Sequence, residues 1–154
     1  MCGIVGAVSK RDISSILLEG LKRLEYRGYD SAGLAIIGDD QKLQRIRIKG
    51  KVDQLEAQYR LAPLRGNTGI SHTRWATHGA PSDVNAHPHS DEEVSVAVVH
   101  NGTIDNYLEI KESLETEGHN FKSDSDSEIL PLLISKYYSG NLVEAVNKVL
   151  DEIH

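Results

Sequence analysis

Residues 43–49 alternate between apolar and basic side chains, and this alternation constrains the fold more strongly than any other feature of the sequence. The alternating members are Ile46 and Ile48 on one side and Arg45, Arg47 and Lys49 on the other. A strand with this pattern buries one face and exposes the other to water. Sheets with one solvated face are usually antiparallel, because the crossover helices of a parallel sheet cover both faces. The segment therefore predicts an antiparallel sheet.

The other elements follow from hydrophobic periodicity and turn residues. Ile13, Leu17 and Leu21 recur at helical spacing after Asp12, which can cap a helix. By the same reasoning we expect strands at 2–9 (buried), 32–38, 43–49, 68–75 and 94–99, and helices at 12–26, about 52–59, 104–114, 127–137 and 142–153. The helices at 104–114 and 127–137 would be capped by Asp105 and Ser127, respectively. This order, with helices alone after the last strand, is typical of an α+β domain.

The amino-acid composition limits the cell compartment and the partners to be expected. The 154 residues are 39% hydrophobic, which is enough for the core of one domain. The net charge of −6 argues against nucleic acid or an anionic membrane as a partner. A single cysteine suits a reducing compartment, charged residues at 10–12 interrupt any signal sequence, and no apolar run approaches the ~20 residues that span a bilayer. We therefore expect a cytoplasmic protein with no membrane partner.

Cys2 is the only cysteine and directly follows the initiator Met1. If Met1 is removed, one residue carries both a thiol, whose thiolate is a strong nucleophile, and an α-amine, a group that ordinarily titrates at ~7.7–8.0. That amine can accept a proton near neutral pH, as in the N-terminal variant of the nucleophile–base pair. The alternative is that Cys2 is a small apolar residue at the start of an edge strand.

Residues 71–79, with the sequence Ser-His-Thr-Arg-Trp-Ala-Thr-His-Gly, are the richest in recognition groups. Arg74, at a strand end, can hold a carboxylate through two parallel hydrogen bonds. Thr77 and His78 add donors, and Trp75, the only tryptophan, can form a hydrophobic wall. The alternative is an ordinary strand end in which Arg74 forms an ion pair with an acidic neighbour.

Two later features also have a structural and a chemical interpretation. Asn101-Gly102 is typical of tight hairpins, but we expect a helix after it. The Asn101 amide and the Gly102 N–H can therefore form an oxyanion hole instead. Asp126 precedes a helix, where it can stabilise the helix start or bind the ammonium group of a substrate.

Histidines at close spacing raise the question of a metal. His87 and His89, together with Asp126, offer ligands for a metal-dependent hydrolase. However, the sequence has no helical His-Glu-x-x-His motif, no pair of cysteines and no glycine-rich phosphate loop. We therefore expect neither a metal nor a cofactor, and keep the metal-dependent hydrolase as a second hypothesis. A non-catalytic amino-acid-binding module is the third.

Four blocks occur in one unbroken order along nearly the whole chain: residues 2–6, 24–33, 72–79 and 100–102. Together they resemble the class II glutamine amidotransferases, N-terminal nucleophile hydrolases that release ammonia from glutamine. The blocks Tyr-Arg-Gly-Tyr-Asp-Ser-Ala-Gly and Arg-Trp-Ala-Thr-His-Gly look like the branch of this family that aminates fructose-6-phosphate. The amidophosphoribosyltransferase branch usually has His and Gln where this chain has Tyr26 and Tyr29.

The resemblance implies a role for each candidate residue. The catalytic groups would be the nucleophile Cys2 and the oxyanion hole of Asn101 and Gly102. The residues that bind L-glutamine would be Arg74, Trp75, Thr77, His78, Gly102, Asp126 and Arg27. The segment around Arg74 would form a mobile flap on the α-carboxylate, Asp126 and the Gly102 carbonyl would hold the α-ammonium, and the loop of Arg27 would close over Cys2.

The resemblance also implies a fold and partners. The fold would be a four-layer αββα sandwich with mainly antiparallel sheets, truncated at its C-terminal end, because the family's glutaminase domain continues beyond His154. Residues 1–154 would thus be the N-terminal part of that domain. In the intact enzyme, sugar-phosphate isomerase domains of the same chain would accept the ammonia, and the enzyme would be a homodimer. A retained Met1 would block the α-amine of Cys2.

Overall fold

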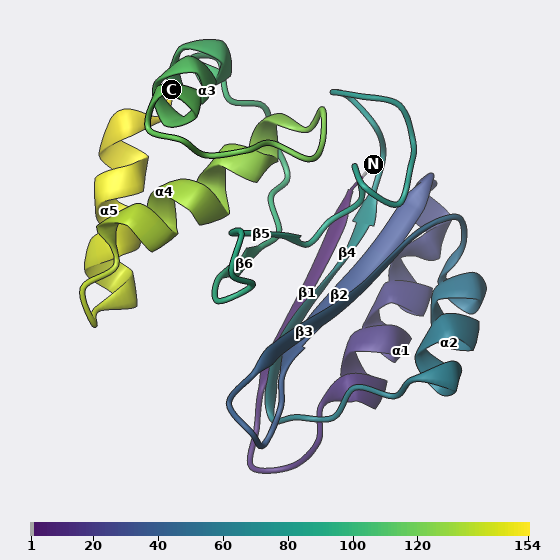
Figure 1. The fold of residues 1–154 in the computed structure, drawn as a ribbon. Helices are drawn as coiled ribbons and strands as arrows, with labels where there is room; N and C mark the ends of the chain where they lie inside the picture. The colour runs from purple at the N-terminus through teal and green to yellow at the C-terminus, as the bar shows by residue number, and fades with distance from the viewer. Residues whose placement is uncertain (1) are drawn as a thin grey trace.

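An antiparallel sheet of four strands forms the centre of the N-terminal half (Figure 1). The computed structural model describes residues 2–154, and the removal of Met1 concerns a residue outside that range. The strands are β1 (Gly3–Val8), β2 (Ser31–Ile37), β3 (Leu43–Lys49) and β4 (Thr68–Arg74), in the order β1-β4-β2-β3 with each neighbouring pair antiparallel. The alternation at 43–49 correctly predicted the bounds of β3 and its antiparallel pairing, but the face expected to be exposed to water is partly covered, because Arg45 and Arg47 are half-buried and donate to the carbonyls of Pro88 and Val84.

Two helices, α1 (Ser14–Leu24) and α2 (Val52–Leu61), cover one face of this sheet (Figure 1). Leu17 and Leu21 of α1 belong to the same buried core cluster as Leu34 and Ile36 of β2. These two β2 side chains point to one face because they are two residues apart in a strand. Other buried members of the cluster are Ile13, Val52 and Leu55. Burial of each large apolar side chain contributes roughly 1.5–3 kcal/mol, so this cluster fixes α1 and α2 on the sheet.

The C-terminal half places helices on the opposite side of the sheet (Figure 1). The helices α3 (Tyr107–Thr116), α4 (Ile129–Tyr137) and α5 (Leu142–Glu152) share a second core cluster. The strands β5 (His89–Ser90) and β6 (Ala97–Val98) form a small antiparallel sheet between α4 and the larger sheet (Figure 1). The layers run helix, sheet, sheet, helix, as expected for the α+β sandwich. Within residues 2–154, no helix is long and apolar enough to cross a membrane.

The strand expected at 94–99 is mostly a loop, which corrects the sequence prediction. The carboxylate Oδ1 of Asp91 accepts hydrogen bonds from the backbone N–H groups of Ser95, at 2.7 Å, and Val96, at 2.8 Å. These bonds close the chain around Asp91, and Val94 adopts a φ of +55°. A side chain thus competes with the strand ladder for the backbone donors, and only Ala97 and Val98 remain in β6.

Strand β1 is half exposed, although a buried strand was expected. Val8 is 81% exposed and Ile4 is 44% exposed, whereas Val5 packs against the core cluster under α1. The reason is that β1 is an edge strand of the sheet. Ile4 and Val8 point away from α1, toward the second sheet. That sheet has only two short strands among the described residues, so these side chains stay exposed.

All three predicted helix caps are also wrong, beginning with Asp12, because the N-cap residue of α1 is Ile13. Asn106, and not Asp105, is the N-cap residue of α3. The backbone N–H of Ile104 donates to Asp126 at 2.9 Å, and this bond holds the chain outside the helix just before its start. Ser127 lies inside the short 3₁₀-helix η2 (Asp126–Glu128), so α4 begins two residues after it.

Candidate active site

A cavity of about 200 Å³ lies where the N-terminus, the end of β4 and two loops of the C-terminal half meet. Its lining residues are Cys2, His72, Arg74, Trp75, Thr77, His87, His100, Gly102, Thr103, Ser125, Asp126 and Ser127. Six of the residues predicted from the sequence are among them: Cys2, Arg74, Trp75, Thr77, Gly102 and Asp126. The fold therefore brings together candidates that are up to 124 positions apart in the chain (from 2 to 126).

The thiol of Cys2 lies against the chain just beyond β4. Gly3 is opposite Thr73 in the antiparallel register, so the preceding residue, Cys2, comes beside Arg74. The backbone N–H of Trp75 donates to Sγ at 3.3 Å, and Sγ is 3.7 Å from the carbonyl oxygen of the same residue. The edge-strand interpretation is correct for β1, yet the free thiol borders the cavity.

Arg74 is a nearly buried cation with spare donor capacity. It is 4% exposed, its Nη2 donates to the carbonyl of His78, and its buried Nη1 has no hydrogen-bond partner among residues 2–154. Burial lowers the pKa of Arg74, while the carboxylates of Asp30 and Asp126 act in the opposite direction. No carboxylate in the described part of the chain lies within ion-pair distance of Arg74, so the ion-pair alternative is wrong.

Asp30 supports this strand end and was not predicted as a site residue. Its Oδ2 accepts a hydrogen bond from the backbone N–H of Ala76 at 2.6 Å, and its backbone N–H donates to the carbonyl of Arg74 at 2.8 Å. These two bonds hold the segment that follows β4. Asp30 belongs to one of the four sequence blocks, but its partners lie more than 40 residues away, so no local pattern indicates the contact.

Asn101 and Gly102 occupy the loop between β6 and α3 and are both exposed. The side-chain Oδ1 of Asn101 is 2.7 Å from Nε2 of the buried His72. Gly102 borders the cavity, and a Cβ at this position would lie 3.0 Å from Nε2 of His100. Because a helix follows, the hairpin interpretation of Asn-Gly is wrong.

Asp126 is 3% exposed and presents a carboxylate to the cavity. Its Oδ2 accepts from the backbone N–H of Ile104 at 2.9 Å, and its Oδ1 accepts from the hydroxyl of Ser127 at 3.3 Å. The carboxylate is thus oriented by groups from the neighbouring loop and from η2. Each carboxylate oxygen can accept more than one hydrogen bond, so the side chain retains capacity for a cationic ligand.

The segment after β4 carries three further predicted residues. Trp75 is 54% exposed, and both Trp75 and Thr77 line the cavity. His78 does not line it, but its Nδ1 is 3.9 Å from Oδ2 of Asp126, and its carbonyl accepts from Arg74. His78 therefore lies between the buried cation and the buried carboxylate.

Arg27 lies outside the cavity lining. It ends the short 3₁₀-helix η1 (Glu25–Arg27), where its Nε donates to the hydroxyl of Tyr26 at 3.2 Å. The next residue, Gly28, comes close to Trp75, because a Cβ at Gly28 would be 3.9 Å from the indole ring. The Arg27 loop is thus adjacent to the segment that follows β4.

Three buried histidines form a row that begins at the cavity. The rings of His72 and His87 stack with centroids 4.3 Å apart, and those of His87 and His89 meet edge-on at 4.6 Å. Burial lowers the pKa of His72 to about 4 and that of His89 to about 3, and holds the pKa of His87 far below its usual range. The three imidazoles are therefore neutral at pH 7.

The geometry gives no support to the metal-dependent alternative. The metal hypothesis combined His87 and His89 with Asp126. Among residues 2–154, no three His, Cys, Asp or Glu side chains are arranged to hold a metal ion. The two histidines instead pack against each other in the row.

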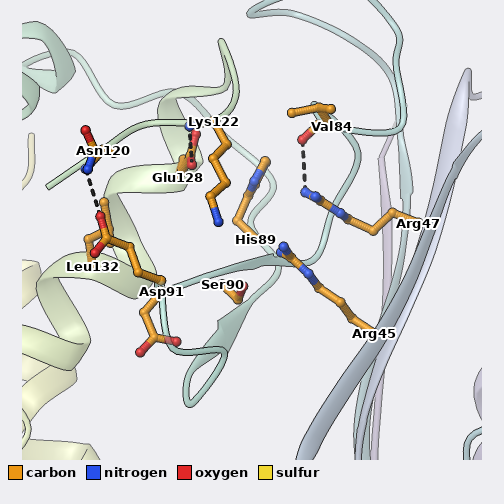
Figure 2. A pocket seen from close by; sticks show the side chains of 11 residues that line it. Arg45, Arg47, Val84, His89, Ser90, Asp91, Asn120, Lys122, Glu128 and Leu132 are labelled. Carbon is orange, nitrogen blue, oxygen red and sulfur yellow. Dashed lines mark hydrogen bonds between the residues drawn. The ribbon is translucent and has the colours of Figure 1, made fainter.

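A second cavity, beside β3, is much smaller, at about 20 Å³ (Figure 2). Arg45 and Arg47 border it, but their guanidinium groups donate to backbone carbonyls, including those of Pro88 at 3.1 Å and Val84 at 2.9 Å. A cavity of this volume has room for about one water molecule and not for an amino acid. The 200 Å³ cavity is therefore the candidate active site.

Residues 72–152 match the glutamine amidotransferase domain family, and this chain belongs to that family. The match covers the end of β4, the loop of Asn101 and Gly102, and the helices α3, α4 and α5. The fold is that of the N-terminal nucleophile amidotransferases, as two solved structures show. The glutamine phosphoribosylpyrophosphate amidotransferase from B. subtilis, complexed with ADP and GMP, superposes with a TM-score of 0.81 at 27% identity, over 99% of this chain and 33% of the other. The allosteric regulatory enzyme of purine biosynthesis does so with a TM-score of 0.83 at 26% identity and the same coverage.

Curated relatives of higher identity carry one common name. The chain is 51% identical over 153 residues to the glutamine–fructose-6-phosphate aminotransferase [isomerizing] of Clostridium acetobutylicum and 50% identical to that of Thermus thermophilus. It is 53% identical over 155 residues to that of Legionella pneumophila. These alignments cover 99% of this chain but about a quarter of each relative, 25% in the first case.

Proposed function

We propose that this chain hydrolyses the side-chain amide of L-glutamine to glutamate and ammonia, with Cys2 as the nucleophile. The observation that carries the proposal is the combination of three groups around one cavity. A free thiol, a buried guanidinium with an unpaired Nη1 and a buried carboxylate all line it. A nucleophile next to fixed positive and negative charges fits an amino acid with a reactive side chain.

Recognition of glutamine uses the two opposite charges. Arg74 binds the α-carboxylate, because its Nη1 is an unpaired buried donor and a guanidinium matches a carboxylate through two parallel bonds. Asp126, with the carbonyl of Gly102, holds the α-ammonium. Trp75, Thr77 and His78 form a flap at the carboxylate end, and the loop of Arg27 closes over Cys2.

The chemistry proceeds through a thioester. Sγ of Cys2 bonds to the amide carbon while the α-amine, free once Met1 is removed, accepts the thiol proton. The Asn101 amide and the Gly102 N–H stabilise the tetrahedral oxyanion, and the loss of one such donor typically costs ~10²–10³ in turnover. The C–N bond then breaks as the α-amine returns the proton to the leaving ammonia. Water adds to the thioester carbonyl, and the C–S bond breaks to release glutamate and the thiol.

The relatives support a larger context for this activity. We infer that residues 1–154 are the N-terminal part of the glutaminase domain of a longer enzyme of the kind named in the relatives. In that enzyme, sugar-phosphate isomerase domains transfer the ammonia to fructose-6-phosphate and form glucosamine-6-phosphate, the enzyme is a homodimer, and it is cytoplasmic. Support comes from about 50% identity over nearly the whole chain.

Ammonia release tests the proposal. The complete natural polypeptide, with Met1 removal verified by intact mass, should release equal amounts of ammonia and glutamate from glutamine. The Cys2→Ala variant should release neither, while retaining glutamate binding. Glutamine binding without ammonia release by the Met1-free protein would instead indicate an amino-acid-binding module. Activity lost on chelation and restored by zinc or manganese would indicate the metal-dependent hydrolase.

A further inference from the structure

His72 is a fully buried ring that borders the cavity and contacts Asn101 of the proposed oxyanion hole. It is 0% exposed, lies near the end of β4 and stacks on His87 with ring centroids 4.3 Å apart. Its Nε2 is 2.7 Å from Oδ1 of Asn101, 29 residues further along the chain. Its Nδ1 is buried and has no hydrogen-bond partner among residues 2–154. The two ring nitrogens are therefore in very different surroundings.

This asymmetry determines where the ring carries its proton. Burial lowers the pKa of His72 to about 4, so at pH 7 the ring is neutral and has one N–H. A proton on Nδ1 would be a buried donor without an acceptor, which costs about 1–3 kcal/mol. A proton on Nε2 forms the 2.7 Å bond and leaves only an unpaired acceptor on Nδ1, and unpaired buried donors are the rarer defect in proteins. The Nε2–H tautomer is therefore favoured.

The tautomer in turn determines the orientation of Asn101. An Nε2–H donor requires an acceptor, so the amide oxygen of Asn101 faces His72, and its NH₂ group points away from the ring. The opposite tautomer would turn the amide by 180° and present an oxygen in place of the NH₂ group. An oxygen there would repel a developing oxyanion, whereas an NH₂ group stabilises it.

We propose that His72 is a positioning residue, whose neutral Nε2–H form holds the Asn101 amide with its NH₂ group directed at the oxyanion. The inference rests on the proposed function. It gives His72, the first member of the histidine row, a role beyond core packing that involves no metal.

The neighbouring main chain keeps this arrangement rigid. Gly33 of β2 lies opposite His72 in the sheet, and a Cβ at Gly33 would be 2.1 Å from the carbonyl oxygen of His87. The glycine thus lets His87 lie directly on the sheet and stack on His72. Nδ1 of His87 accepts from the backbone N–H of His100 at 3.3 Å, next to Asn101. His87 thus holds the main chain of the loop at His100, and His72 holds the side chain of Asn101.

A double-mutant cycle of His72 and Asn101 distinguishes a positioning role of His72 from a purely structural one. His72→Phe keeps a ring of similar size on His87 but removes the donor. We expect kcat for glutamine hydrolysis by the complete natural polypeptide to fall at least ~10-fold and at most ~10³-fold, with KM changed less than about threefold. In an Asn101→Ala background, the same substitution should change kcat by less than about twofold, because nothing is left to orient. His89→Phe, at the far end of the row, is the matched control and should leave kcat within about twofold.

The tautomer itself provides a readout that does not depend on activity. Long-range ¹H–¹⁵N spectra of the wild-type imidazoles at pH 7 should show His72 protonated at Nε2 alone. A proton on Nδ1, a doubly protonated ring, or an equal loss of kcat for His72→Phe with and without Asn101 would each overturn the inference. This spectrum keeps the test valid even if His72→Phe does not fold. A wild-type protein that releases no ammonia would overturn the proposed function, whereas the spectrum would still report on His72.

Discussion

Arg74 shows how a single side chain can indicate a ligand before the ligand is seen. A guanidinium that is 4% exposed has lost most of its hydration, and its unpaired Nη1 makes this burial more costly. The nearby carboxylates of Asp30 and Asp126 are bonded to backbone groups rather than to Arg74. An anion in the cavity would supply the missing acceptor.

Arg74→Lys should weaken the binding of glutamine. Lysine keeps the charge but replaces a planar fork with a single point charge, so one of the two bonds to the α-carboxylate is lost. We expect KM for glutamine to rise at least ~10-fold, the effect of losing one charge-assisted hydrogen bond of about 1.5–3 kcal/mol. Steady-state hydrolysis measures it. Arg60→Lys, at an exposed surface ion pair with Glu56, is the control, and an unchanged KM in Arg74→Lys would remove Arg74 from the site.

At the scale of elements, the segment 75–79 joins the strand end to the cavity. Asp30 anchors its beginning through Ala76, and the His78 carbonyl is held by Arg74. Trp75, which precedes both anchors, is 54% exposed and lines the cavity. A segment anchored at Ala76 and His78 can turn its exposed aromatic side chain toward a ligand without disturbing the sheet.

Trp75 gives this segment a built-in probe, because it is the only tryptophan in the chain. Binding of glutamate should bury part of the indole, shift its emission to shorter wavelength and reduce quenching by acrylamide. Arg74→Lys should weaken the ligand dependence of both signals. An emission spectrum that does not change at saturating glutamate would show that the segment is not a flap over the ligand.

The strands and the site residues differ in how well the sequence alone could predict them. The alternation at 43–49 predicted β3, because apolar and polar side chains that alternate favour a strand, but it did not predict that the distant carbonyls of Pro88 and Val84 cover its basic face. The apolar run at 94–99 did not become a full strand, because the Asp91 carboxylate takes its backbone donors. Cys2 and Arg74 were predicted from residue type and block order, and Asp126 from its residue type and its position before a helix. The role of His72 was not, because it depends on a tautomer chosen by a partner 29 residues away.

At the scale of the whole molecule, the histidine row lies between the two halves. His72 belongs to β4 of the large sheet, and His89 belongs to β5 of the small one. The three rings are nearly fully buried and neutral, so the contact between the halves is formed by groups that would carry charge in water at mildly acidic pH. The fold therefore becomes sensitive to acid at this junction.

Stability should fall as the pH falls from 7 to 5.5. In the unfolded chain these histidines titrate near 6.5, whereas in the folded chain the pKa of His72 is about 4 and that of His89 is about 3. The unfolded state thus binds more protons in this window, and each buried histidine lowers the free energy of unfolding by about 1 kcal/mol. Urea unfolding at the two pH values measures the change. His89→Phe should reduce the pH dependence by about 1 kcal/mol, and a wild-type stability that is flat over this range would contradict the burial of neutral rings.

Covalent labelling of Cys2 tests the proposed nucleophile most directly. A diazoketone analogue of glutamine keeps the α-ammonium and α-carboxylate and alkylates a thiolate that is positioned for attack, with loss of dinitrogen. In protein shown by intact mass to lack Met1, we expect one adduct per chain, mapped by peptide mass spectrometry to Cys2, suppressed by excess glutamine and slowed in Arg74→Lys. A folded, Met1-free protein that forms no adduct, or forms it on another residue, would contradict the assignment of Cys2 as the nucleophile of a glutaminase.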